Sequence, residues 1–189
     1  YFSVPNLKFM IKNGYSNAMN FEHPYFLEEN MIDYLLKKNG FKILKKRKYL
    51  NHSIFYKTKK TTINPKKIKA YRKFKLNKNL FKDYYKNLKK DINLINKKIK
   101  THQSVYLFGA HIFSQMLIFN GLNLSSIKNI LDNDKKKQNR YLYGTKIKVI
   151  GPKSLSKVDK PVIILRAAQY SNEIKKDILK NINKKTIFI

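Results

Sequence analysis

The stretch from Ser104 to Asp134 constrains the fold of this chain more than any other part of its sequence. It opens with a short apolar run that ends at the turn residues Gly109-Ala110, and apolar residues then recur at helical spacing. A second apolar run, Ile127 to Leu131, follows and ends at Asp132. This order predicts the opening βαβ unit of a doubly wound α/β domain, in which ligands gather at the carboxyl ends of parallel strands.

The remainder of the C-terminal half extends this unit. Its predicted helix carries Ile112, Gln115-Met116 and Phe119 at helical spacing and ends at Gly121. Further along we expect a strand at Lys146–Ile150, a buried strand at Pro161–Leu165, a helix capped by Ser171 that carries Ile174, Ile178 and Ile182, and a last strand at Thr186–Ile189.

The N-terminal part of the chain has the pattern of the end of a mixed sheet. A strand at Tyr1–Val4 precedes a short helix that starts at Leu7. Two alternating segments, Phe41–Leu50 and His52–Thr58, are predicted to form a hairpin joined at Asn51. Because the chain has no initiating Met and begins inside a strand, we expect it to be the C-terminal part of a longer protein.

A helix is predicted just before this hairpin, from about Glu28 to Lys38. Acidic residues in its first turn, lysines in its last turn and the C-cap Asn39-Gly40 mark its ends. Met31 and Tyr34-Leu35 are its expected apolar stripe.

A basic, aperiodic segment separates the two halves, and we place a domain boundary there, giving domains at residues 1–60 and 61–189. The second domain begins with a long basic helix at about 78–100. Its apolar face predicts packing, either over the following sheet or as a bridge to the first domain. The residues of that face are Leu80-Phe81, Tyr84-Tyr85, Leu88, Ile92, Leu94-Ile95 and Ile99.

The chain is strongly basic, with 42 Lys and Arg against 11 Asp and Glu and a net charge of +31. The basic residues are spread along the chain instead of massed in one arm, and the abundance of Asn, Ile, Lys, Tyr and Phe is typical of an A/T-rich coding sequence. We therefore expect no specific nucleic-acid partner, and only weak binding that ignores sequence and collapses with salt.

Other function classes are limited by what the sequence lacks. Without cysteine there is no disulfide or thiolate metal site, which fits a cytoplasmic protein. No uninterrupted apolar segment is long enough to predict a membrane span. The histidines outside position 23, namely His52, His102 and His111, lack metal-ligand spacing.

The turn at Gly109-Ala110 stands where a dinucleotide-binding fingerprint would stand, with Asp132 at the position of a ribose-binding acid. Only the first glycine of the fingerprint matches, because His111 replaces the glycine that lets a pyrophosphate approach the backbone. The alternative is that Gly109-Ala110 simply makes the tight turn between strand and helix.

Glu22-His23 is the second candidate site. An imidazole titrates near neutral pH and a neighbouring carboxylate favours its protonated form, so the pair could act as a general base with an orienting partner. Adjacent side chains on an extended segment point to opposite faces, and a purely structural histidine is the alternative.

Taken together, these segments resemble one family. The order Ser-Val-Pro-Asn near the start, Asn20-Phe21-Glu22-His23-Pro24-Tyr25-Phe26, the helix ending in Asn39-Gly40-Phe41 and the later Tyr106-Leu107-Phe108-Gly109-Ala110 is similar to the S-adenosylmethionine-dependent C-methyltransferases of nucleotide-linked deoxysugars. The resemblance implies the end of a class I methyltransferase sheet over 1–60, followed by a Rossmann-like C-terminal domain. The cofactor-binding motif and a zinc module of the family would then lie upstream of this chain.

The resemblance also implies roles for individual residues. Glu22 and His23 fall on the pair proposed in the family to remove the proton next to a sugar ketone, which makes the adjacent carbon nucleophilic toward the methyl sulfonium of the cofactor. An Asp-x-x-x-x-Lys-Gln-x-Arg-x-x-x-Gly stretch of the family falls on Asp132, Lys137, Gln138, Arg140 and Gly144. The residues expected to contact a nucleotide-sugar substrate are thus Tyr25, Gly109, Ala110, Asp132, Lys137 and Arg140.

Two hypotheses follow. The first is an enzyme fragment, inactive alone, with Glu22 and His23 as its catalytic residues. The second is a noncatalytic, basic Rossmann-like module that binds nucleotide sugar or nucleic acid.

Overall fold

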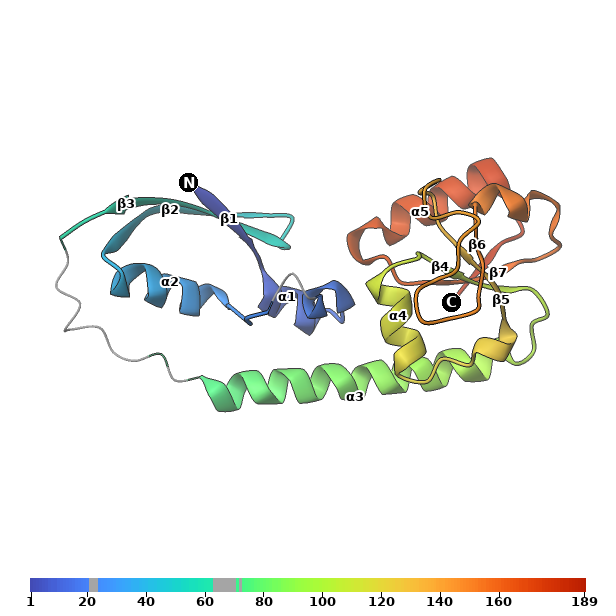
Figure 1. Cartoon of the computed structure of the whole chain (residues 1–189), viewed down its shortest axis with the longest axis horizontal. Coiled ribbons are helices and arrows are strands. Elements are labelled where there is room, and N and C mark those ends of the chain that lie inside the picture. The colour runs from blue at the N-terminus through green and yellow to red at the C-terminus, as the bar shows by residue number, and fades with distance from the viewer. Residues whose placement is uncertain (21–23, 63–70, 72) are drawn as a thin grey trace. The chain divides into compact units, whose positions relative to one another are not determined.

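The computed structural model describes residues 1–20, 24–62, 71 and 73–189. The chain divides into two compact units, Tyr1–Tyr85 and Lys86–Ile189 (Figure 1). Helix α3 (Phe74–Ile99) runs across this division and begins four residues before the predicted start near 78. The predicted domain boundary near residue 60 adjoins residues outside the described ranges and stays a prediction.

The first unit is a three-stranded sheet with helices. Its strands β1, β3 and β2 are neighbours in that order, and both pairings are antiparallel. Leu50 and Asn51 at the hairpin turn have positive φ, as a tight turn requires. The predicted hairpin is confirmed. The elements are β1 (Phe2–Pro5), α1 (Leu7–Lys12), α2 (Glu29–Lys38), β2 (Phe41–Tyr49) and β3 (Ser53–Lys60).

Helix α2 packs on one face of this sheet through a stripe other than the predicted one. Ile32 is buried against Ile54 and Tyr56 of β3, and Leu36, one turn further, packs on the same cluster. The predicted stripe of Met31 and Tyr34-Leu35 is only half-buried, so that prediction was wrong. The C-cap prediction is confirmed, because Gly40 has φ +77° and donates its N–H to the Lys37 carbonyl.

The second unit is a five-stranded parallel sheet in the order β6-β5-β4-β7-β8. The chain starts at the central strand β4, winds outward to β6, and returns to β7 on the other side of β4. This reversal defines a doubly wound sheet and confirms the predicted fold class. The elements are β4 (Val105–Phe108), α4 (Ile112–Phe119), β5 (Ile127–Leu131), β6 (Val149–Ile150), β7 (Val162–Leu165), α5 (Ser171–Asp177) and β8 (Ile187–Phe188).

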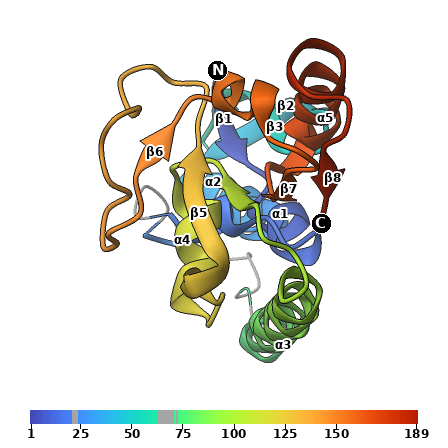
Figure 2. The same ribbon diagram turned by 90° about the vertical axis from the view of Figure 1, so that its right-hand side faces the viewer.

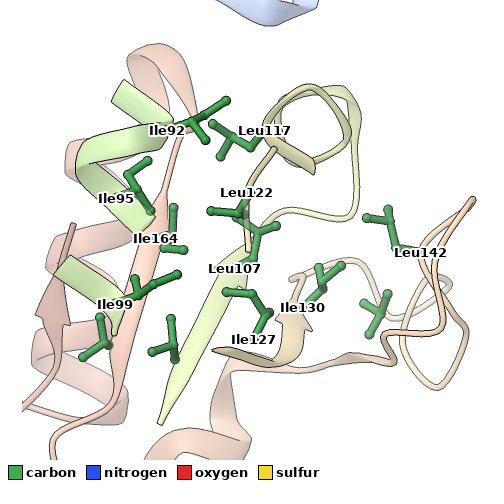
Figure 3. Close-up of a cluster of buried hydrophobic side chains, with 13 residues drawn as sticks. Ile92, Ile95, Ile99, Leu107, Leu117, Leu122, Ile127, Ile130, Leu142 and Ile164 are labelled. Atoms are coloured by element: carbon green, nitrogen blue, oxygen red, sulfur yellow. The ribbon is translucent and has the colours of Figure 1, made fainter. Parts of the chain in front are cut away.

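Both faces of the parallel sheet are covered, because successive residues of a buried strand point to opposite sides. Val105 and Leu107 belong to the buried cluster that residues of α3 and α4 also form. Figure 3 shows Leu107 within this cluster together with Ile95 and Ile99 of α3. Tyr106 and its alternate neighbours belong to the cluster on the other side, against which Ile174 of α5 packs. Figure 2 shows α5 on the side of the sheet away from α4. The packing role predicted for the long helix is therefore confirmed for its C-terminal half.

The helix predicted after Gly109-Ala110 is confirmed as α4, in which Ser114 and Leu117 are buried and Phe119 is 86% exposed. Because α4 is apolar nearly all round, its sequence does not fix which side faces the sheet. Two local predictions were wrong. Leu94 of α3 is exposed. Ser171 begins α5 without capping it, since its Oγ accepts the Ala167 N–H at 3.3 Å.

Two strands are shorter than predicted. Only Val149–Ile150 of the expected Lys146–Ile150 strand pairs with β5, and Lys148 instead bridges to Tyr141. The last strand is Ile187–Phe188. No helix among the described residues is long and apolar enough to cross a membrane.

The packing of α3 generates a stability prediction. We expect Ile99→Ala to lower the free energy of unfolding by about 2–5 kcal/mol, because Ile99 is fully buried between α3 and the sheet. Leu94→Ala on the same helix is the matched control and should change stability by less than about 0.5 kcal/mol, since Leu94 is 57% exposed. Chemical denaturation followed by circular dichroism measures both, and equal losses would contradict this packing.

Candidate functional site

The carboxyl ends of the parallel strands form the candidate site of the second unit. In doubly wound sheets, ligands bind where the strand order reverses, which here is between β4 and β7. Gly109 directly follows β4, Asp132 follows β5 and Arg166 follows β7. The topology alone therefore gathers the ends of these strands at one edge.

Glycine is required at position 109 by the backbone conformation there and by a neighbouring side chain. Its φ is +98°, a conformation that residues with a side chain rarely adopt. A Cβ placed on Gly109 would collide with the His111 imidazole, so the ring covers the turn closely. The Gly109 N–H donates to the Leu131 carbonyl at 2.7 Å and ties the end of β4 to the end of β5.

His111 is the N-cap residue of α4. Its Nδ1 accepts the Phe113 N–H at 3.3 Å, which satisfies one backbone donor at the start of the helix. Burial lowers the pKa of His111, the Asp132 charge opposes this shift, and the Lys137 charge adds to it. The imidazole is therefore neutral at pH 7, and with Nδ1 as the acceptor its proton lies on Nε2.

The Asp132 carboxylate holds the loops of the site together. Asp132 is 7% exposed, its Oδ2 accepts the Ala110 N–H at 2.7 Å, and its Oδ1 accepts the Asp134 N–H at 2.8 Å. The Lys137 ammonium lies 3.4 Å from Oδ2 and its side chain is 40% exposed. Asp132 is thus engaged by the protein, whereas Lys137 keeps N–H donors that a ligand can meet.

The loop after Asp132 is fixed by its next residues. Gln138 donates its side-chain N–H to the Asp132 carbonyl at 2.9 Å. Arg140 accepts the Val149 N–H through its carbonyl at 2.8 Å, while its side chain is exposed. These contacts hold the chain beside β6, and Lys137 and Arg140 lie on the same loop.

The structure brings some predicted site residues together. Gly109, Ala110, Asp132 and Lys137 form one contact group, joined by the bonds just described. Tyr25 belongs to the first unit, where it is 74% exposed. The predicted catalytic residues Glu22 and His23 lie outside the described residues.

The turn at Gly109 does not fit a nucleotide cofactor. The His111 ring covers the backbone that a pyrophosphate would need to approach, and the Asp132 carboxylate that would bind a ribose hydroxyl already accepts two backbone N–H groups. Residues 1–20, 24–62, 71 and 73–189 also contain no group of three His, Asp or Glu residues placed to bind a metal ion.

Arg166 and Asp91 are a pair that the sequence did not reveal. Arg166 Nη2 donates to Asp91 Oδ1 at 2.8 Å and Nε donates to Oδ2 at 3.0 Å, a two-pronged contact between β7 and α3. Its Nη1 also donates to the Ile189 carbonyl at 3.0 Å. Arg166 directly follows a buried apolar run, so its sequence position indicates the carboxyl edge of the sheet. The sequence does not indicate its partner Asp91, which is 75 residues away.

A doubly wound parallel sheet with both faces covered defines a Rossmann-like domain. The chain belongs to the family described as the C-methyltransferase C-terminal domain, whose model matches residues 52–189. This confirms the predicted C-methyltransferase family. No curated protein matches the sequence.

The close contact at Gly109 gives a testable outcome. We expect Gly109→Ala to lower the free energy of unfolding by about 3 kcal/mol or more, because backbone strain and the collision with His111 add. The control is Gly144→Ala, which has φ +77° and open space around its Cβ, and should cost only about 1–2 kcal/mol of strain. Equal losses in thermal or chemical unfolding would show that the His111 ring does not cover the turn.

The lowered pKa of His111 predicts a pH dependence of stability. Its pKa in the folded protein lies below the ordinary 6.5, so in this window the unfolded chain binds more protons and stability falls as the pH drops below 6.5. His111→Asn keeps a capping side chain but cannot titrate. The stability difference between wild type and His111→Asn should be constant above about pH 7.5 and shift against the wild type on acidification. Urea unfolding of both proteins across this pH range measures the stability difference. A difference that does not change with pH would contradict the lowered pKa of His111.

Proposed function

We propose that this chain is the C-terminal part of an S-adenosylmethionine-dependent C-methyltransferase that acts on a nucleotide-linked deoxy keto sugar. The single observation that carries the proposal is the family match over residues 52–189, on a domain whose strand order reverses between β4 and β7. The sugar class is supported by the likeness of the segment from Asn20 to Phe26 to the family of sugar C-methyltransferases.

In this proposal the C-terminal domain contributes to binding of the substrate. The partly exposed Lys137 ammonium and the exposed Arg140 side chain supply positive charge for the diphosphate of a nucleotide sugar. Gly109, Ala110 and Asp132 form the rigid turn that positions Lys137. Tyr25 contacts the sugar beside the catalytic pair.

The reaction needs a base that is unprotonated near neutral pH. His23 takes the proton from the carbon next to the ketone, and the electron pair of the broken C–H bond forms the enolate. Glu22 supports the imidazolium that results. S-adenosylmethionine supplies an electrophilic methyl group, and it is held by residues that precede Tyr1 in the full-length protein, where a zinc module would also lie.

The second candidate is a basic Rossmann-like module that binds nucleotide sugar or nucleic acid without catalysis. The enzyme and the noncatalytic module are distinguished by incubating the full-length protein with methyl-labelled S-adenosylmethionine and a nucleotide-linked 4-keto sugar. Label that becomes attached to a sugar carbon supports the enzyme. Sugar binding without transfer, by folded protein that also binds the cofactor, supports the module.

The role of His23 is tested in the full-length enzyme. We expect His23→Asn to keep the fold and the cofactor affinity but to lower turnover by about two to four orders of magnitude, the usual share of general base catalysis. Glu22→Gln is the matched control and should cost less, because it keeps a hydrogen-bond acceptor and loses only the charge.

Exchange of the substrate proton with solvent measures proton abstraction separately from methyl transfer. Deuterium uptake from solvent at the carbon next to the ketone, followed without methyl transfer, should nearly stop in His23→Asn. If that variant exchanges its proton at the wild-type rate, His23 is structural and another residue is the base.

A further inference from the structure

The outer face of the β2–β3 hairpin differs from the face that packs on α2. Side chains alternate along the strands, so Ile54 and Tyr56 point to α2 while Phe55 and Lys57 point away from it. Figure 1 shows α2 on one side of the β2–β3 ribbon. We use the name outer face for Lys42, Lys45, Arg47, Phe55, Lys57 and Lys59, which lie on the side opposite α2.

Within the described ranges, the acidic residues that pair with this hairpin, Glu29 and Asp33, lie on the side of α2. Lys46 lies 2.6 Å from Glu29 and 2.8 Å from Asp33, and Lys48 lies 3.0 Å from Glu29. These pairs join β2 to α2. The charge of the inner lysines is therefore balanced within the protein.

The cations of the outer face are exposed and lack such partners. In the part of the chain that the structure describes, none of them forms an ion pair with a carboxylate. The register places Lys45 directly opposite Lys57, and Lys42 directly opposite Lys59. Like charges directly across an antiparallel pair are destabilising, and a bound polyanion would relieve that repulsion.

Aromatic rings lie among these cations. Phe55 is 48% exposed, faces Arg47 across the strands, and meets the 55% exposed Tyr49 edge-on with ring centres 6.5 Å apart. An open groove of about 360 Å³ is lined in part by Lys45, Arg47, Phe55 and Lys57. The coding bias accounts for how many lysines and aromatic residues the chain carries, but not for a fold that sets two exposed rings among unpaired cations on one face.

We propose that the outer face binds single-stranded nucleic acid without reading its sequence. Cations would track the phosphates and Phe55 would stack on a base, the combination that single-strand binding surfaces use. The cations from Lys42 to Arg47 lie opposite Lys59 to Phe55, four strand steps that extend over about 14 Å. This span is longer than one diphosphate group and favours a polymer over a mononucleotide. This inference is independent of the methyltransferase proposal, because it uses a surface of the first unit alone.

The test is fluorescence anisotropy of the full chain with a labelled 15-mer of deoxythymidine at several salt concentrations. We expect micromolar binding at low salt that weakens steeply as salt rises. Lys45→Gln/Arg47→Gln should weaken binding at low salt by about tenfold and reduce the slope of log affinity against log salt by about 1.4, because each single-strand phosphate contact contributes about 0.7. Phe55→Leu should weaken binding by roughly tenfold, and Phe55→Tyr should bind like the wild type.

Lys89→Gln/Lys90→Gln is the matched control, since it removes the same charge from exposed positions of α3. A loss in this control equal to that in Lys45→Gln/Arg47→Gln would overturn the proposal, because the binding would then be diffuse. Unchanged affinity in folded Phe55→Leu would also overturn it. So would competition by thymidine diphosphate as strong as that by the unlabelled 15-mer at equal phosphate, or binding to phosphatidylserine vesicles without binding to the 15-mer.

Discussion

The Asp132 carboxylate is the interaction on which the edge of the parallel sheet depends. It is nearly buried, a costly position for a charge, and it is stabilised there by N–H donors from the turn after β4 and from its own loop, with the Lys137 ammonium alongside. Removal of the carboxylate would leave the Ala110 N–H without its acceptor. One side chain at the end of β5 thus joins the turn after β4 to the loop that carries Lys137.

The main topology could be predicted because buried parallel strands appear in sequence as continuous apolar runs. Ile127–Leu131 is the clearest case, since the predicted and observed strands coincide. The orientation of α4 could not be predicted, because a helix that is apolar on all sides has no stripe, and Phe119 points to solvent. The capping role predicted for Ser171 failed for a similar reason. Serine is a good capping residue, but here its hydroxyl accepts the N–H of the preceding Ala167 instead.

The candidate site was predictable in its position but not in its contacts. The rule that ligands gather at the carboxyl ends of parallel strands pointed to Gly109 and Asp132, and the family resemblance added Lys137. That Asp132 binds the Ala110 N–H depends on how two loops meet in space. The same holds for Arg166 and Asp91, because no local pattern relates residues so far apart in the chain.

The central position of β4 has a consequence for how the second unit folds. β4 pairs with β5 across the short α4 connection, but it also pairs with β7, which is formed from residues much later in the chain. The first pairing closes a small loop and the second a large one, and the entropy of loop closure must be overcome before the later contacts form. The β4–α4–β5 segment is therefore the natural nucleus, and the side of β4 that awaits β7 stays open to wrong partners until the rest of the sheet arrives.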